Sequence, residues 1–317
     1  MRRFHPYLAA WMLTASCAQR IGTHADPPAA DVPSADVETV DAGTDATPAT
    51  VDDVTPRCAD GACTLGCAPG TWNCDDDLRN GCESHRACPS VMLSGFGGST
   101  GYGPDAQCVH PSDNGAYAGP GAREGDPPVP VDLSPAFPDG LNIRGIRPQA
   151  MFVNINGAIS FGQPLVQGTP SALPVRGQAI IAPWWADVDT RGGAQPARNN
   201  VCFVRQPGRV VVTWDRVGYF DRHDDRSNSF QLVVRTDPEA CPRGSPIVEF
   251  RYARCGWTRG DASGEAHALA GLDTGTGHDY IALPVSLSPA VASLCTLSNV
   301  PGGPPGLFSF ILRRSGC

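Results

Sequence analysis

Two aspartates, Asp187 and Asp189, are the residues whose type and spacing come closest to a chemical function. They follow the apolar run 179–185, and their side chains share one face if that strand continues through them. A carboxylate pair on one face can hold a cation or serve as an acid and a base. No third acid, histidine or nucleophile lies nearby in the sequence. We therefore expect both side chains to be structural, accepting backbone N–H bonds in the turn that leads to Arg191.

A second pair of acids, Asp75 and Asp77, lies in a cysteine-rich segment and also suggests calcium. An EF-hand loop would need an oxygen ligand at position 79 and a glutamate at position 86, but both positions hold arginine. The dipeptide Asn80-Gly81 instead predicts a tight turn with the acids on its solvated flank. Asp75, Asp77, Asp187 and Asp189 remain the candidates for binding calcium. The favoured interpretation assigns no metal, no cofactor and no catalytic residue to the protein.

Other sequence signals for chemistry are incomplete. The glycine-rich stretch 94–103 does not match G-x-G-x-x-G, and no G-x-S-x-G elbow or H-E-x-x-H motif is present. Four tryptophans of the C-terminal part could form platforms for carbohydrate. Trp184 and Trp214 are expected in the core because they lie in strand-like runs, whereas Trp185 and Trp257 are compatible with either role.

Composition limits the classes of protein. The 317 residues include 36 glycines and 31 prolines, which favours short strands joined by turns over a helical bundle. The net charge of −8 has the wrong sign for general nucleic-acid binding. No apolar run reaches the length of about 18 residues that a membrane-spanning helix needs. Thirteen cysteines without a C-x-x-C motif indicate disulfides and an oxidising compartment.

Strand patterns dominate from residue 94 onward. Two apolar runs around Asn156-Gly157 predict a hairpin, and two valine-rich runs around 206–209 predict a second. The run 179–185 has no polar alternation and predicts a strand buried on both faces. Further strands are expected at 230–234, 247–252, 280–283 and 307–312. The predicted fold is all-β, an antiparallel sandwich or a flattened barrel.

The N-terminus predicts export. Basic residues followed by a short apolar run form a signal peptide over residues 1–16. The run 13–17 resembles a bacterial lipobox, which makes Cys17 the site of lipid attachment and the outer-membrane surface the expected location. Cleavage after Ala18 by ordinary signal peptidase, giving a secreted protein, is the alternative.

Three further segments follow the signal. Residues 17–56 are acidic, proline-rich and free of aromatic residues, and predict a disordered linker. Residues 57–93 hold six cysteines and few large apolar residues, and predict a small disulfide module. Residues 94–317 form the β domain. Its six cysteines are expected to pair among themselves, and Cys241 with Cys255 is the predicted pair that flanks strand 247–252.

A set of separated motifs in the β domain points to a known family. They keep their order along the chain and read FVNINGAISFG (152–162), IIAPWWADVDTR (180–191), VVTWDRV (211–217), NSFQ (228–231), IVEFRY (247–252), AGLD (270–273) and LSNVPG (297–302). In this respect the chain from about Tyr102 to Arg314 resembles the nidogen-like extracellular domain, which nidogens, tectorins and many bacterial surface proteins contain. The extra cysteines and Trp184, where phenylalanine is usual, depart from the family pattern.

The resemblance implies a binding module and no enzymatic activity. The expected function is cell-surface adhesion or matrix contact by a domain displayed on a lipid-anchored stalk. The expected partner is an extracellular matrix or cell-surface protein or glycan, with the membrane contacted through the lipid only. The alternative is a secreted carbohydrate-binding protein or a hydrolase that uses Asp187 and Asp189.

Overall fold

The computed structural model describes residues 54–59, 62–68, 91–98, 101–193, 199–237, 245–260 and 266–312. The chain divides into two units, Met1–Thr47 and Pro48–Cys317, and all the described residues belong to the second. Cys17, Asp75, Asp77 and Cys241 lie outside the described residues. Within the described ranges, no helix is long and apolar enough to cross a membrane.

A short antiparallel hairpin lies in the cysteine-rich segment. It consists of β1 (Val54–Ala59) and β2 (Ala62–Cys67), and its register places Cys58 opposite Cys63. β1 begins inside the last residues of the predicted linker.

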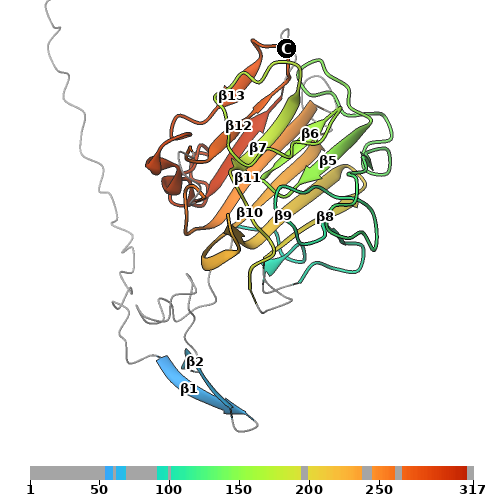
Figure 1. Cartoon of the computed structure of the whole chain (residues 1–317). Helices are drawn as coiled ribbons and strands as arrows, with labels where there is room; N and C mark the ends of the chain where they lie inside the picture. The colour runs from blue at the N-terminus through green and yellow to red at the C-terminus, as the bar shows by residue number, and fades with distance from the viewer. Residues whose placement is uncertain are drawn as a thin grey trace, which may run out of the picture. The chain divides into compact units, whose positions relative to one another are not determined.

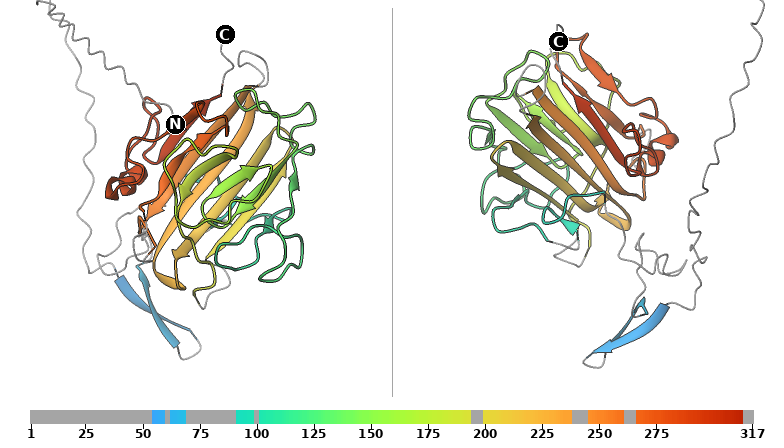
Figure 2. Two further views of the ribbon diagram at one scale, coloured as in Figure 1. Left: turned by 45° about the horizontal axis from the view of Figure 1, so that its top comes forward. Right: turned by 180° about the vertical axis from the view of Figure 1, so that it is seen from behind.

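The β domain consists of two six-stranded antiparallel sheets, one in front of the other in Figure 1. The first sheet has the order β13-β12-β7-β6-β5-β4, with strands Tyr280–Ala282, Leu269–Asp273, Ala179–Trp185, Ala158–Phe161, Ala150–Asn154 and Val131–Asp132. The second has the order β14-β11-β10-β9-β8-β3, with strands Leu307–Ile311, Ser245–Cys255, His223–Asp237, Arg209–Tyr219, Asn200–Gln206 and Gln107–Cys108. Figure 2 shows the same two layers from other directions. The predicted all-β sandwich is confirmed, and the sheets do not close into a barrel.

Both predicted hairpins form. β5 and β6 pair across Asn156-Gly157, where Gly157 has a φ of +76°. β8 and β9 pair across Pro207 and Gly208. The pairing of β9 with β10 extends much further than the predicted run 230–234, because a tip at 220–222 joins two strands of 11 and 15 residues. The polar residues 221–229, most of which belong to β10, hid the length of the hairpin from a pattern of apolar runs.

The core lies between the two sheets and contains side chains from both. Trp184 from β7 lies with its ring centre 6.2 Å from that of Phe230 on β10, and Phe230 stacks on Trp214 of β9 at 5.0 Å. Tyr252 of β11 contacts Trp184 edge-on and donates its hydroxyl to the Pro183 carbonyl at 2.7 Å. Such large aromatic side chains contribute most of the apolar area that the core buries.

Segments without regular structure cover the outer face of each sheet. Leu165, Leu173 and Val175 lie on the outer side of β7 and form a small second core with Ile180 and Trp185. β7 is therefore buried on both faces, as its continuous apolar run predicts.

On the other sheet, the outward polar side chain of Gln231 bonds to the segment around Leu93 and Phe96. A side chain at Gly97 would approach Thr213 Cγ2 to 2.7 Å, which explains the glycine at this position.

Two disulfides join described residues, and both lie within the β domain. Cys108 of β3 pairs with Cys202 of β8. Cys255, at the end of β11, pairs with Cys295 of the 3₁₀ helix η3 (Pro289–Cys295). The predicted Cys241–Cys255 bridge is therefore wrong. Flanking a strand in sequence does not bring two cysteines together, whereas η3 packs beside β11 and places the Cα atoms of Cys255 and Cys295 6.0 Å apart.

Candidate functional site

The segment after β7 carries the two aspartates to one end of the domain, and the structure gives them different surroundings. Asp189 is fully buried, and its carboxylate binds Arg191 three times. The Arg191 backbone N–H and Nε each donate to Oδ1 at 2.9 Å, and Nη2 donates to Oδ2 at 2.6 Å. These bonds hold the pKa of Asp189 below its usual value, although burial opposes them. The predicted structural role of Asp189 in the turn to Arg191 is confirmed.

Asp189 also holds a loop that is distant in sequence. Its Oδ2 accepts the backbone N–H of Arg222, at the tip of the β9–β10 hairpin, at 3.0 Å. Both Asp221 and Arg222 have positive φ, of 60° and 63°, a conformation that costs free energy for residues with a side chain. The carboxylate therefore stabilises a strained hairpin tip.

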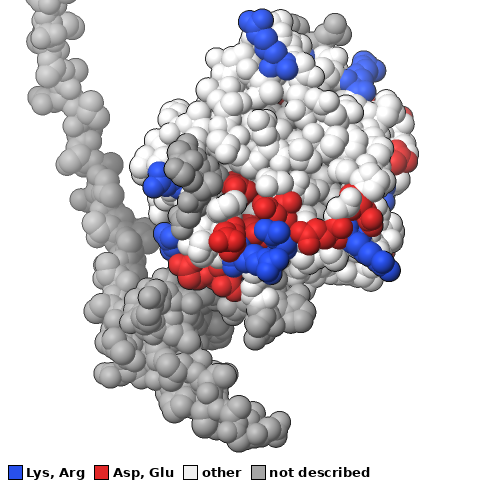
Figure 3. Space-filling model, in the orientation of Figure 1, with Lys and Arg blue, Asp and Glu red and all other residues white. Residues whose placement is uncertain are grey.

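Arg191 also pairs with two acids in the segment that precedes the first sheet. Its Nη2 lies 3.2 Å from Asp113 Oδ2, and its Nη1 lies 3.4 Å from Glu124 Oε1. The backbones of Asp113 and Asp189 also form an isolated antiparallel bridge. In Figure 3, acidic and basic side chains gather in one band across the face shown. Around Arg191, charges of both signs are paired, so ion pairs rather than a field of one sign characterise this end of the domain.

Asp187 has no comparable partners. The residue is 6% exposed, and its Oδ1 is buried without a hydrogen-bond partner. Burial, followed by the charges of Asp113 and Asp189, raises the pKa of Asp187 to about 6, although Arg191 opposes the shift. The prediction that Asp187 accepts backbone N–H bonds in the turn is wrong for Oδ1, because the turn directs its N–H groups to Asp189.

Asn156 connects this segment to the β5–β6 turn. Its Oδ1 accepts the Val188 N–H at 3.0 Å, and its Nδ2 donates to Asn114 Oδ1 at 2.8 Å and to the Val166 carbonyl at 3.3 Å. The sequence motif indicated only a turn at this asparagine. Asp113 and Asn114 carried no sequence signal for a site, because more than 70 residues separate them from Asp187.

The tryptophans do not form a carbohydrate platform. Trp184 and Trp214 are core residues, as predicted, and Trp185 and Trp257 are buried as well. Trp185 Nε1 donates to the Gln167 carbonyl at 2.8 Å, and Trp257 Nε1 donates to the Val217 carbonyl at 3.0 Å. Their polar edges are thus used inside the protein.

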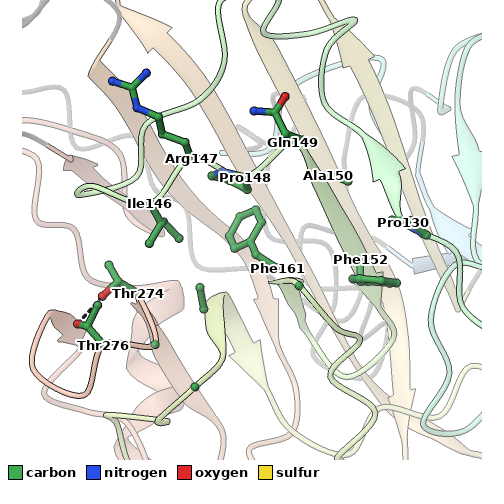
Figure 4. Close-up of a pocket in the computed structure, with 14 residues that line it drawn as sticks. Pro130, Ile146, Arg147, Pro148, Gln149, Ala150, Phe152, Phe161, Thr274 and Thr276 are labelled. Carbon is green, nitrogen blue, oxygen red and sulfur yellow. Dashed lines mark hydrogen bonds between the residues drawn. The ribbon is translucent and has the colours of Figure 1, made fainter.

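A groove of about 610 Å³ lies at one end of the first sheet, where β5 and β7 begin and β6 and β12 end. Phe152 of β5 and Phe161 of β6 form its apolar floor together with Ile146, and Arg147 and Gln149 contribute polar groups. Figure 4 shows the Phe161 ring between Ile146 and Phe152, with the polar ends of Arg147 and Gln149 directed away from it. Phe161 is only 7% exposed and belongs to the main core, so the half-buried Phe152 and Ile146 supply most of the apolar surface of the groove. Such a surface suits recognition of an apolar group.

Comparison with known proteins agrees with this architecture. The family model of the nidogen-like domain matches residues 149–207 and 202–314, which together make up just over half of the chain. The chain belongs to the nidogen-like domain family. The matched region extends from the end of the groove-lining segment 146–150 through β14 and includes both aspartates, whereas Asp113, Asn114 and Glu124 precede it.

Curated relatives match about half of this chain. Alpha-tectorin of Mus musculus is 29% identical over 197 residues, which cover 52% of this chain and 9% of that protein. Alpha-tectorin of Homo sapiens is 28% identical over the same length, and nidogen of Drosophila melanogaster is 24% identical over 199 residues, or 14% of its length. The chain thus spans a small part of the curated relatives that it matches. No solved structure matches the chain.

Proposed function

We propose that this protein is a non-enzymatic extracellular adhesion or matrix-contact protein, whose nidogen-like domain is displayed on a lipid-anchored stalk. The observation that carries the proposal is that the carboxylate of Asp189 is already engaged by hydrogen bonds and an ion pair. Asp189 is committed to Arg191 and to the hairpin tip, so it cannot exchange protons as a catalytic acid or base. The nearby carboxylates of Asp113 and Glu124 also pair with Arg191, so Asp187 has no partner acid free for hydrolysis. Binding is the function that remains for the domain.

The apolar groove supplies a surface for such binding. Its floor is formed by Phe152, Phe161 and Ile146, and large apolar side chains in a concave surface are typical anchor points of protein interfaces. A glycan would require more polar groups than the groove offers. We therefore infer that the occupant is an extended segment of an extracellular protein with an apolar side chain that packs against Phe152 and Ile146.

Replacing Phe152 with aspartate tests the groove. The side chain is only partly buried and points away from the core, so the variant should fold, which thermal unfolding can check. Retention of the purified full chain on envelope or matrix material from the producing cell should fall at least tenfold, because a charge would replace an apolar anchor. Leu297→Asp is the matched control, since Leu297 is 47% exposed and does not line the groove. Equal retention of Phe152→Asp and the wild type would contradict the proposal, as would specific capture on a glycan array.

The lipid anchor is tested by Cys17→Ser. Two or more acyl chains hold a protein stably on a bilayer, so the wild type should fractionate with membranes. The variant should either appear in the medium or fail to mature, with the β domain still folded. A wild-type protein found soluble in the medium with its N-terminus at Gln19 would show that the domain is secreted without an anchor.

A further inference from the structure

The strand β14 forms one edge of the second sheet, so one side of its backbone faces away from every other strand. Gly306 and Leu312, which flank the strand, each make a backbone hydrogen bond to β11. Because successive residues of an antiparallel strand bond to opposite sides, Leu307, Ser309 and Ile311 direct their N–H and C=O groups outward. A row of outward backbone groups can pair with a strand of another molecule.

The side chain of Asn299 bonds to the middle of this edge. Its Oδ1 accepts the Ser309 N–H at 2.7 Å, and its Nδ2 donates to the Ser309 carbonyl at 3.0 Å. The directly opposed residue of an added antiparallel strand would make the same two bonds. Asn299 is itself exposed, so water could satisfy its amide equally well. The two bonds therefore serve the strand edge and not the burial of the asparagine.

The residues beside Asn299 hold it against the strand. Ser298 Oγ donates to the Leu307 carbonyl, another outward group of β14, at 2.7 Å. The same oxygen accepts the Val300 N–H at 3.1 Å, which fixes the backbone on the other side of the asparagine. The amide is thus kept at Ser309 by its neighbours as well as by its own bonds.

The sequence of β14 is nearly self-complementary about Ser309, because it reads Leu-Phe-Ser-Phe-Ile. An antiparallel pair of two such strands, centred on Ser309, would place each leucine opposite an isoleucine and each Phe308 opposite a Phe310. Apolar and aromatic pairs of this kind stabilise neighbouring strands. Phe310 is only partly buried at the edge of the core, and Ile311 is 45% exposed. The run 307–312 contains no charge, proline or glycine, a composition typical of segments that associate by strand pairing.

We propose that Asn299 blocks the pairing of β14 with β14 of a second copy of this chain. It occupies the two groups that the central Ser309 pair would need, so a second copy can pair there only after the asparagine leaves. Natural sheets commonly protect an edge by covering it with a loop. The inference goes beyond the proposed groove function and does not depend on it, because it concerns the edge of the other sheet.

Sedimentation velocity of the Asn299→Ala variant tests the proposal. The full chain is used with Cys17→Ser throughout, so that acyl chains cannot cause association. Adding Asn299→Ala should lower the dissociation constant of the dimer at least about tenfold, because neither copy has to release two hydrogen bonds before pairing. Asn142→Ala is the matched control, since it removes an amide that bonds to the N–H of Gly145 in a turn and not to a strand edge. This control should sediment like the parent chain.

A second change, Ser309→Pro, shows whether β14 forms the interface. Proline lacks an N–H, but the N–H of Ser309 faces outward, so the pairing of β14 with β11 is kept. In the Asn299→Ala chain, Ser309→Pro should restore the monomer. Amide hydrogen exchange gives an independent measure: in Asn299→Ala, exchange at Ser309 should slow as the protein concentration rises, because pairing protects the amide.

Three results would overturn the proposal. They are an Asn299→Ala chain as monomeric as Asn142→Ala, a dimer that survives Ser309→Pro, and an opened edge that captures a strand of a different protein without forming the dimer. If thermal unfolding shows that Asn299→Ala does not fold, Asn299→Ser replaces it, because a hydroxyl is too short to bond to both backbone groups of Ser309. The same three results then apply.

Discussion

Replacing Asp189 with alanine is expected to lower the free energy of unfolding by about 3 kcal/mol, because removing one partner of a buried ion pair leaves the other groups unsatisfied. The backbone N–H groups of Arg191 and Arg222 lose their acceptor, and the Arg191 guanidinium loses its closest carboxylate. The tip at Asp221 and Arg222 also loses a bond that offsets its positive φ values. Denaturant unfolding measures the loss, and amide hydrogen exchange at Arg222 should accelerate beyond the change in global stability.

Asp224→Ala is the matched control for this prediction. It removes an acid two residues beyond the hairpin tip, at the start of β10, but its side chain is exposed, so the free energy of unfolding should change by less than about 0.5 kcal/mol. If Asp189→Ala were as stable as Asp224→Ala, the carboxylate of Asp189 would not be the group that joins these loops.

Gly157→Ala is expected to destabilise the domain by about 4 kcal/mol. Gly157 has a φ of +76°, and a Cβ atom at this position would lie 1.7 Å from the Trp184 carbonyl oxygen. The obstacle is backbone of β7, which is paired on both sides and cannot move aside alone. The cost therefore combines the left-handed conformation, about 1–2 kcal/mol, with displacement of a core strand.

Gly162→Ala separates these two contributions. Gly162 has a φ of +84°, but a Cβ there would meet nothing within 4 Å. We expect this variant to lose only the conformational part, about 1 kcal/mol, in the same denaturant experiment. Similar losses for the two variants would mean that β7 yields readily at Trp184.

Local patterns in the sequence predicted much of the architecture. The Asn156-Gly157 hairpin and the continuously buried strand β7 follow from short-range rules, because turn conformation and the alternation of side chains are properties of a few consecutive residues. The pattern also predicted the role of Asp189, since the donor in its own turn, the Arg191 N–H, lies only two residues away. The same rules missed the full length of the β9–β10 hairpin, whose polar tip breaks the apolar pattern.

Tertiary structure decided the features that depend on distant partners. Cys255 pairs with Cys295 and not with Cys241, because η3 packs beside β11. Asp187 and Asp189 look equivalent in the sequence. Arg222 nevertheless donates only to Asp189, and Asp113 pairs with the Arg191 that Asp189 holds, while Asp187 Oδ1 has no hydrogen-bond partner. Those partners come from a hairpin tip and from a segment more than 70 residues earlier, and only the packing of the two sheets brings them to one end of the domain. Short-range periodicity sets which face a side chain takes, but it carries no information about which distant group will lie opposite it.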